Sequence, residues 1–298
     1  MARQISLDDT ARADDPDRDA ARGDGTMEVL PDLAAQRLAI VNIAFAGPPQ
    51  AGDRTWVLID AGLFGTAELI RSAAARRFGM ASRPAAILLT HAHFDHVGVL
   101  ATLADAWDVP VFAHPLEHPY LDGRASYPAP DPTVGGGLMS LASPLFPRGP
   151  IDIGERLRAL PEDGSVPALP GFRWIHTPGH SAGHVSFWRD ADAVLVAGDA
   201  FVTTRQESIY AATTQSPEMH GPPMYYTTDW PAAAASVRRL AALAPEIVVV
   251  GHGRPMRGPV MQSALKELAA NFEEVAVPKH GYYVDHPARS ENGSAYDG

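Results

Sequence analysis

One short segment concentrates the side chains that are best suited to chemistry. It reads His-Ala-His-Phe-Asp-His from His91 to His96, so three imidazoles and one carboxylate fall within six positions. Imidazole nitrogens and carboxylate oxygens are suitable ligands for Zn²⁺, iron and Mn²⁺. Because four ligands crowd around one tetrahedral ion, a turn could direct His91 and His93 to one cation and Asp95 and His96 to another. The spacing therefore predicts a metal centre with two ions.

Three further candidate ligands lie downstream, each beside glycine. His180 follows the sequence Thr-Pro-Gly, Asp199 follows a glycine, and His252 has a glycine on either side. Glycine allows the backbone to turn sharply and to approach a neighbour closely. The chain contains no cysteine, which excludes thiolate ligands, thiolate nucleophiles and disulfides. We expect a metal-bound water rather than a side chain to act as the nucleophile.

Short apolar runs come before several of these candidate ligands. Three of them, at 85–89, 194–197 and 247–250, lead directly into loops that contain His or Asp. Short apolar runs bounded by turn residues are typical of buried strands. Functional sites are commonly built on loops that a rigid sheet supports. We therefore expect the candidate ligands to meet at the ends of buried strands.

The remaining patterns alternate between strands and helices. Apolar stretches at 38–46 and 55–59, separated by Gly- and Pro-rich residues, predict a hairpin. Thr66 is expected to cap a helix, and two more helices should begin near Asp229 and after Pro259. The apolar face of the first helix would comprise Leu69, Ile70, Ala73, Ala74 and Phe78. Hairpins interleaved with helices predict an α/β sandwich.

The composition is that of an ordinary globular protein. Of the 298 residues, 46% are hydrophobic and 20% are charged, which excludes collagen-like, coiled-coil and wholly disordered chains. The 24 Lys and Arg residues against 35 Asp and Glu give a net charge of −11. Because a nucleic-acid binder needs a cationic face to displace counterions, we expect no nucleic-acid partner.

The two ends of the chain differ from its centre. Residues 1–26 are rich in Asp and Arg and lack the apolar run of a signal peptide, so we expect a disordered arm there. Residues 290–298 should form a disordered tail, which leaves 27–289 as one domain. Charged residues, Pro and Gly interrupt each apolar stretch before it reaches the length of a membrane span. The expectation is a cytoplasmic protein without membrane contact.

The segment from Pro115 to Gly171 is rich in Pro and Gly and has little periodicity. Long irregular loops in compact domains usually serve a function. We therefore predict that residues 115–171 are an insertion that forms a lid or pocket wall and supplies no metal ligand. The glycines at 135–137 would act as its hinge.

Together these motifs resemble those of the metallo-β-lactamase-fold hydrolases. The His-x-His-x-Asp-His segment, a Thr-Pro-Gly-His element, a Gly-Asp pair and a Gly-His-Gly element occur in the family's order, after an Asp-Ala-Gly turn at Asp60. The resemblance extends over residues 27–278. It implies a four-layer αβ/βα sandwich with a dinuclear metal site at one edge.

The resemblance also implies a role for each candidate ligand. One metal would be held by His91, His93 and His180, the other by Asp95, His96 and His252, and Asp199 would bridge the two. Asp60 and His184 would hydrogen-bond beside the metals without binding them. Asp95 would also orient the metal-bridging hydroxide and carry a proton toward the leaving group. The implied cofactors are two divalent ions, with zinc favoured and iron or manganese as alternatives.

Differences from individual branches of this family narrow the function. β-Lactamases of one type use a cysteine at the second metal, and those without it normally lack the bridging carboxylate that Asp199 provides here. We therefore do not expect β-lactam hydrolysis. Flavodiiron proteins have Glu in place of His93, and nucleases of the family would conflict with the net charge of −11.

Two branches remain similar to this chain. Glyoxalase II-like thioesterases share the seven ligands but have a longer helical region after the last one, whereas only 46 residues follow His252 here. Lactonases share the ligands but place a tyrosine where this chain has Val202. Tyr210, Tyr225 or Tyr226 could take that place from another loop.

Apolar and aromatic residues near the motifs in sequence are candidates for the substrate pocket. They are Leu138, Met139, Phe146, Phe201, Tyr225 and Tyr226. As pocket walls they favour a small substrate with an apolar acyl or aryl group. They could instead pack in the core or at a homodimer contact.

The sequence therefore predicts a metal-dependent hydrolase that cleaves a carboxylic ester, a lactone or a thioester. The alternatives are a mononuclear iron dioxygenase that acts on a persulfide, a phosphotriester hydrolase, and a non-catalytic binding protein. The last is disfavoured because all seven ligand positions are filled.

Overall fold

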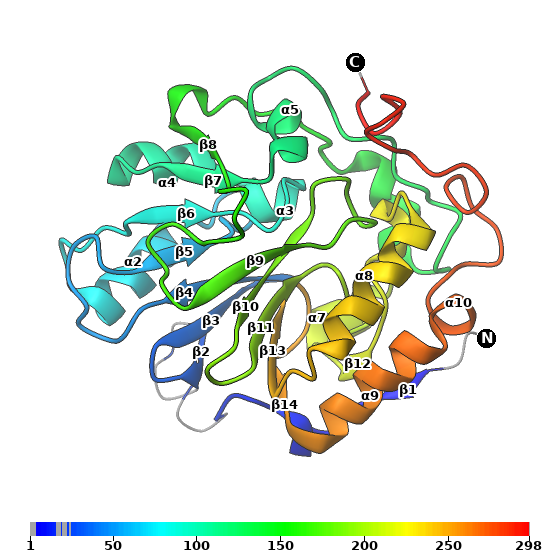
Figure 1. Cartoon of the computed structure of the whole chain (residues 1–298), viewed down its shortest axis with the longest axis horizontal. Helices are drawn as coiled ribbons and strands as arrows, with labels where there is room; N and C mark the ends of the chain where they lie inside the picture. The colour runs from blue at the N-terminus through cyan, green and yellow to red at the C-terminus, as the bar shows by residue number, and fades with distance from the viewer. Residues whose placement is uncertain (1–3, 16–18, 20–22, 24, 298) are drawn as a thin grey trace.

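Two large β-sheets face each other, and helices cover the outer side of each (Figure 1). The computed structural model describes residues 4–15, 19, 23 and 25–297. The outer helices are α2 (Ala67–Phe78) and α4 (Leu100–Trp107) on the first sheet, and α8 (Trp230–Ala242) and α9 (Gly258–Ala270) on the second. The predicted four-layer α/β sandwich is confirmed.

The first sheet has seven strands in the order β2-β3-β4-β5-β6-β7-β8. They are β2 (Thr26–Leu30), β3 (Leu33–Leu38), β4 (Val41–Ala46), β5 (Val57–Ile59), β6 (Ala86–Leu88), β7 (Val111–Ala113) and β8 (Leu157–Ala159). Strands β2 to β5 pair antiparallel, and β5 to β8 pair parallel. The antiparallel pairing of β4 with β5 confirms the predicted hairpin.

The second sheet has five strands in the order β14-β13-β11-β10-β9. They are β9 (Phe172–His176), β10 (Val185–Arg189), β11 (Val194–Gly198), β13 (Ile247–Val250) and β14 (Met256–Arg257). Strands β11 and β13 are parallel neighbours, so their carboxyl ends reach the same edge. A further pair of short strands joins β1 (Ile5–Ser6) to β12 (Glu218–Met219).

Short helices occupy the connections between these elements. They are α3 (Phe94–Val97), α5 (His118–Leu121), α6 (Leu138–Ala142), α7 (Ile209–Thr214) and α10 (Phe272–Val275), with 3₁₀ turns η1 (Asp9–Ala11), η2 (Pro115–Glu117), η3 (Ser143–Leu145), η4 (Gly154–Arg156) and η5 (Met224–Tyr226). Of the helices described, none combines the length and the apolar character that a membrane crossing requires.

The predicted helix starts are close to the observed ones, with two local differences. Asp229 caps α8, because its carboxylate accepts a hydrogen bond from Ala232 N at 3.0 Å. Thr66 precedes α2 but does not cap it, since its hydroxyl donates to Leu63 O at 2.6 Å instead. Leu69 points outward from α2 with 56% of its surface exposed, so its predicted place on the apolar face was wrong.

The facing sides of the two sheets form the centre of the molecule. Val57 and Ile59 of the first sheet share a buried cluster with Phe187, Val196 and Val249 of the second. Two other clusters pack the outer helices onto the sheets. Strands that are covered on both faces need apolar residues at successive positions, which explains the uninterrupted apolar runs of β5, β11 and β13.

The beginning of the chain differs from the expected disordered arm. β1 pairs with β12 and lies beside α9 (Figure 1), and Ala11 is fully buried. Ala13 N donates to Pro255 O at 3.0 Å. The polar composition of the segment gave no sign of this docking, because only its few apolar residues pack against the rest of the protein. Residues 1–3, 16–18, 20–22 and 24 of the predicted arm lie outside the described residues.

The C-terminal segment is docked rather than disordered as far as Asp297. The Tyr120 hydroxyl donates to Ala295 O at 2.6 Å, and Ser126 and Asp297 exchange two backbone hydrogen bonds. Ala295 is 2% exposed. These partners lie far away in the sequence, which is why the local composition gave no sign of them. Gly298 lies outside the described residues.

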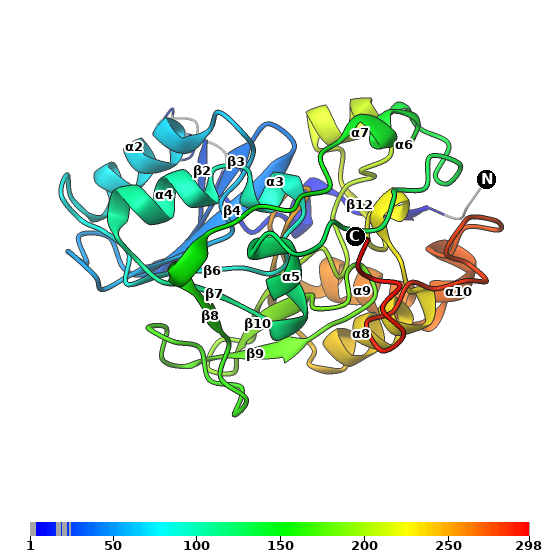
Figure 2. The same cartoon turned by 90° about the horizontal axis from the view of Figure 1, so that it is seen from above.

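The predicted insertion at 115–171 is partly regular. Its strand β8 pairs parallel with β7 and forms one edge of the seven-stranded sheet, which the sequence did not predict. Three residues are too few to show a strand periodicity. The part around α6 lies beside α7 (Figure 2), and Met139 N donates to Glu207 O at 3.2 Å.

The packing between the sheets predicts a large stability effect at Phe187, which is fully buried. Replacing it with Ala leaves a cavity in the central cluster, so Phe187→Ala should lower the free energy of unfolding by about 3–5 kcal/mol. Urea denaturation measures the change. Phe64 is 91% exposed and provides the matched control, for which Ala should change stability by less than about 0.5 kcal/mol. Equal effects of the two substitutions would contradict the described core.

Candidate metal centre

Five segments bring the seven candidate ligands to one edge of the two sheets. The segment after β6 carries His91 and His93, and α3 follows with Asp95 and His96. The other three ligands lie in the loop between β9 and β10, at the end of β11 and after β13. These are His180, Asp199 and His252. All seven side chains are buried.

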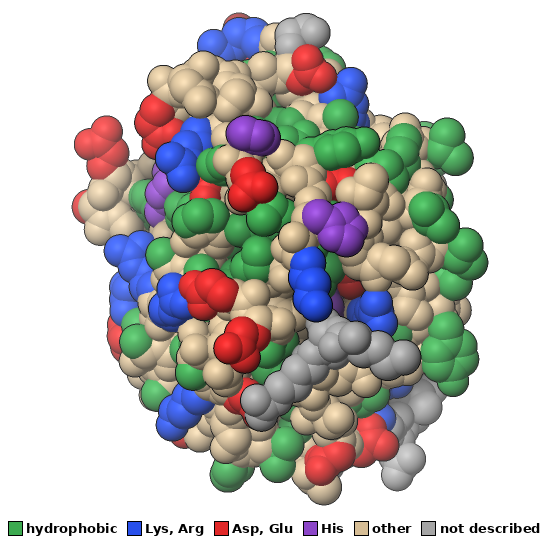
Figure 3. Space-filling model, turned by 90° about the vertical axis from the view of Figure 1, so that its right-hand side faces the viewer, with side chains coloured by type: hydrophobic (Ala, Val, Ile, Leu, Met, Phe, Trp, Pro, Cys, Tyr) green, Lys and Arg blue, Asp and Glu red, His purple; other side chains and the backbone are tan. Residues whose placement is uncertain are grey.

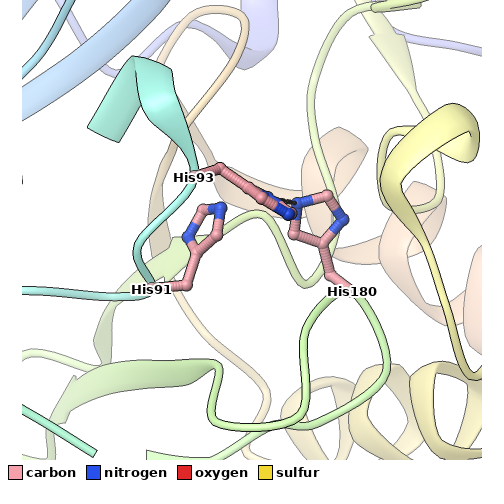
Figure 4. A group of neighbouring side chains, drawn as sticks. All are labelled: His91, His93 and His180. Carbon is pink, nitrogen blue, oxygen red and sulfur yellow. Dashed lines mark hydrogen bonds between the residues drawn. The ribbon is translucent and has the colours of Figure 1, made fainter. Parts of the chain in front are cut away.

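The ligand atoms of these residues converge into three overlapping groups. In each group the atoms lie within 4.8 Å of one another. The groups are His91, His93 and His180; His91, His96 and Asp199; and Asp95, His96 and His252. In the first group the three imidazoles point toward a common point, with His93 Nδ1 3.0 Å from His180 Nε2 (Figure 4). The structure therefore brings together every ligand that the sequence predicted.

Hydrogen bonds on the far side of the rings fix which nitrogen faces the cluster. His96 Nδ1 lies 2.9 Å from Asp60 Oδ2, and His252 Nδ1 lies 2.7 Å from Ile40 O. Since both oxygens are acceptors, Nδ1 carries the proton and Nε2 keeps a free lone pair. His180 follows the same pattern through the Thr227 hydroxyl, which accepts at 3.3 Å and donates its own proton to Pro223 O.

Three buried polar atoms at the centre lack a hydrogen-bond partner among the described residues. They are His91 Nε2, His96 Nε2 and Asp199 Oδ1. Burying such atoms without a partner costs free energy, which a cation would offset because each atom has a lone pair to donate. The nitrogen and oxygen donors suit zinc, iron or manganese. The residues present therefore fit a metal centre.

The charge states of four of the ligands agree with that fit, whereas at His96 and His252 burial is outweighed by Asp199, which raises their pKa, so a cation would have to displace a proton there. Burial and neighbouring histidines lower the pKa of His91 and His93, and burial lowers the pKa of His180 to about 4. These rings are therefore neutral near pH 7. Burial opposes the charge on Asp199, but His252 and His96 outweigh it and lower its pKa. Neutral imidazoles and an ionised carboxylate are the forms in which these groups bind metals.

Two glycines allow the strand ends to approach this closely. A Cβ on Gly251 would lie 2.0 Å from Asp199 Oδ1, and one on Gly198 would lie 2.6 Å from His184 Nε2. Contacts this short do not occur, so a side chain at either position would displace a member of the cluster. Gly198 of the Gly-Asp element and Gly251 of the Gly-His-Gly element are thus needed because no larger residue fits beside the ligands.

The sequence model of the Metallo-beta-lactamase superfamily matches residues 40–252, a range that includes all seven candidate ligands. The chain belongs to this superfamily. A relative from Bacillus subtilis (strain 168), the "Probable metallo-hydrolase YflN", is 43% identical over 256 residues, which are 86% of this chain and 97% of the relative.

Solved structures of the superfamily have the same fold. The BLEG-1 B3 metallo-beta-lactamase is 27% identical with a TM-score of 0.50, covering 75% of this chain and 90% of that one. A beta-lactamase domain protein from Burkholderia ambifaria is 22% identical with a TM-score of 0.56, covering 83% of this chain and 73% of that one.

Asp60 and His184 each hydrogen-bond to a candidate ligand. Asp60 Oδ2 accepts hydrogen bonds from His96 Nδ1 and from the Thr90 hydroxyl, the latter at 2.8 Å. His184 Nε2 accepts a hydrogen bond from Asp199 N at 2.9 Å, while its Nδ1 lies 2.8 Å from the Thr177 hydroxyl. Both residues orient ligands from behind, where the sequence placed them.

The predicted pocket residues separate into two groups. Tyr226 stacks on His93 at 4.5 Å between ring centroids, and Phe146 lies 5.4 Å from Phe94 and 6.3 Å from Tyr225. These aromatic rings, hereafter the aromatic wall (Phe94, Phe146, Tyr225 and Tyr226), lie beside the ligands. Of the other predicted residues, Leu138 is 62% exposed, whereas Met139 and Phe201 are buried, as Tyr225 and Tyr226 also are.

Three residues that support the site had no signal in the sequence. The Asn42 amide donates to Val250 O at 2.9 Å and to Gly253 O, and so holds the loop of His252. Glu117 and Tyr127 bind the backbone of Ala92. None of the three belongs to a motif, and their partners are distant in sequence. Only the fold brings them to the ligands.

Proposed function

We propose that this chain is a dinuclear metal-dependent hydrolase that cleaves a carboxylic ester, a lactone or a thioester. The observation that carries the proposal is the position of the aromatic wall beside seven candidate ligands, one of which, Asp199, contacts members of both ligand sets. The name of the Bacillus subtilis relative, a probable metallo-hydrolase, agrees with the reaction class. The choice among ester-type bonds rests on the aromatic wall.

Asp199 is the carboxylate that two cations would share. Its Oδ2 lies 3.4 Å from His180 Nε2 and 3.1 Å from His252 Nε2, and its Oδ1 lies 3.5 Å from His96 Nε2. It therefore contacts a member of each set. His91, His93 and His180 would hold one ion, and Asp95, His96 and His252 the other. We favour zinc, with iron or manganese as alternatives.

When bound, divalent cations supply Lewis acidity and a water that is deprotonated near neutral pH. The residues of the chain orient the reactants and exclude bulk water, since every ligand is buried. Asp95 belongs to the second set, with Oδ2 3.5 Å from His252 Nε2. We assign its carboxylate to orient the attacking water and to carry a proton toward the leaving group.

The aromatic wall indicates the part of the substrate that does not react. A wall of this kind favours a small substrate with an apolar acyl or aryl group. The face shown in Figure 3 carries acidic and basic side chains interspersed with apolar ones, and within its described part no broad basic area is visible. We therefore expect a small-molecule substrate and, given the net charge of −11, no nucleic-acid partner.

The shared carboxylate predicts metal contents that differ between two variants. The purified protein should contain about two transition-metal ions per chain. Asp199→Ala should strongly lower the number of metal ions per chain, because both ions lose a ligand. Asp95→Ala should remove mainly one ion. Elemental analysis measures both. About one iron per chain with oxygen consumption would instead favour a persulfide dioxygenase, and full metal content in both variants would contradict the assigned roles.

A substrate panel tests the reaction itself. We expect turnover of carboxylic esters, lactones or thioesters with an apolar acyl or aryl group, and loss of turnover in Asp199→Ala. The measurement is initial rate with the zinc-loaded protein and a dinitrophenyl or thiol-release readout. Turnover of a phosphotriester alone would favour the phosphotriester hydrolase. A metal-loaded protein inactive on the whole panel would contradict the proposal.

The position of Phe146 predicts an effect on substrate choice. Phe146→Ala shortens the aromatic wall, so kcat/KM should change by about tenfold more for a long acyl group than for acetyl, while metal content stays constant. An ester series of increasing acyl length measures this. Leu69→Ala, at a half-exposed position on the outer helix α2, is the control and should leave the profile unchanged. A uniform change along the series would place Phe146 outside the pocket.

A further inference from the structure

Glu117 carries a buried carboxylate that the proposed reaction does not use. It ends the 3₁₀ turn η2 and is fully buried. Four donors converge on its two oxygens. Oε1 accepts from Ser181 Oγ at 2.8 Å and Gly183 N at 2.9 Å, and Oε2 accepts from Ala92 N at 3.0 Å and the Tyr127 hydroxyl.

Three of these four donors belong to the two ligand-bearing segments. Ala92 lies between His91 and His93, whereas Ser181 and Gly183 follow His180 in the loop between β9 and β10. One side chain therefore joins the two segments that must converge for the first ligand group to form. Each oxygen serves one segment, so the spacing of the carboxylate oxygens sets the spacing of the segments.

Tyr127 extends this arrangement to a ligand ring. Its hydroxyl donates to Glu117 and accepts from Ala92 N at 2.9 Å. Its ring contacts the His93 imidazole with 4.2 Å between centroids. The same residue thus holds the backbone before His93 and supports one face of the ring.

Only a carboxylate can satisfy this arrangement. Hydroxyl groups can reverse their role, but the backbone N–H groups of Ala92 and Gly183 can only donate. An amide at position 117 would direct its NH₂ group at one of these two N–H groups in either orientation. Two donors about 3 Å apart leave both without an acceptor, and buried groups pay a free-energy cost for that.

We propose that Glu117 is a positioning residue that sets the separation of the His91–His93 segment and the His180 loop, and thereby the metal affinity of that three-histidine group. This inference rests on the proposed function only in assuming that the group binds a divalent metal. It predicts an effect on metal affinity from a residue that touches no ligand atom.

Gly183 offers an independent approach to the same contact. A Cβ on this residue would lie 2.7 Å from Glu117 Oε1, and the backbone φ of Gly183 is not in the left-handed region. Gly183→Ala should therefore act through this clash rather than through backbone strain. It should push the His180 loop and Glu117 apart.

The test measures Co²⁺ binding by metal-free full-length protein in a His252→Ala background, which leaves the three-histidine group as the main site. Visible absorption of bound Co²⁺ follows the titration. Glu117→Gln and Gly183→Ala should each weaken Co²⁺ binding by at least about tenfold, the range seen when the partners of metal ligands are removed. Urea unfolding of the metal-free variants, measured in parallel, reports stability separately.

Asp131→Asn is the matched control, because Asp131 is 2% exposed and accepts hydrogen bonds from Thr133 N and Tyr282 N but does not touch the two ligand segments. It should bind Co²⁺ as the parent does. A Glu117→Gln protein with the parent's Co²⁺ affinity would overturn the proposal, even if its stability fell. Should that variant not fold, unchanged affinity in Gly183→Ala and in Tyr127→Phe would overturn it equally.

The parent protein separates the two hypotheses. If it binds no Co²⁺ or Zn²⁺, the proposed function fails, whatever the variants do. If it binds metal and Glu117→Gln matches it, the proposed function stands and only the positioning role fails.

Discussion

The architecture of the site depends on one constraint: several lone pairs must point at the same small, buried volume. Each such atom has lost its water, and those at the centre have no hydrogen-bond partner among the described residues. The fold accommodates this by satisfying the other end of each ring, as Asp60 does for His96 and Ile40 O does for His252. The strands that supply the ligands must also end within reach of one another, which requires glycine at 198 and 251.

This constraint links the two halves of the sandwich. Ile40 lies directly before β4 of the seven-stranded sheet and Asn42 lies within it, yet both bind the loop of His252, which follows β13 of the five-stranded sheet. Glu117 makes the same connection between the segment after β6 and the loop before β10. The sheets therefore contact through polar groups at this edge and through apolar groups everywhere deeper. The chemically reactive side chains are therefore concentrated at this edge, and apolar packing between the sheets supports them.

The ligands and the strands that carry them could be predicted from the sequence because both are local signals. The His-x-His-x-Asp-His segment spans only six residues, and an apolar run such as that of β13 can be recognised without knowledge of the strands beside it. Glu117 and Asn42 could not be predicted, since their partners are far along the chain and a single Glu or Asn forms no pattern. The terminal segments were misjudged for a related reason. Their polar composition is real, but Ala11 and Ala295 find buried places that only the folded surface offers.

The docking of Ala295 on Tyr120 has a consequence for the order of events during synthesis. A growing chain acquires the helix with Tyr120 long before it acquires Ala295, because 175 residues separate the two. Tyr120 also stacks on Tyr127 at 3.7 Å, so the support behind His93 stays incomplete in that interval. A nascent chain could thus present all its ligands to cellular metal while this brace is still missing. Metal captured on the ribosome would meet a looser site than metal offered to the finished fold.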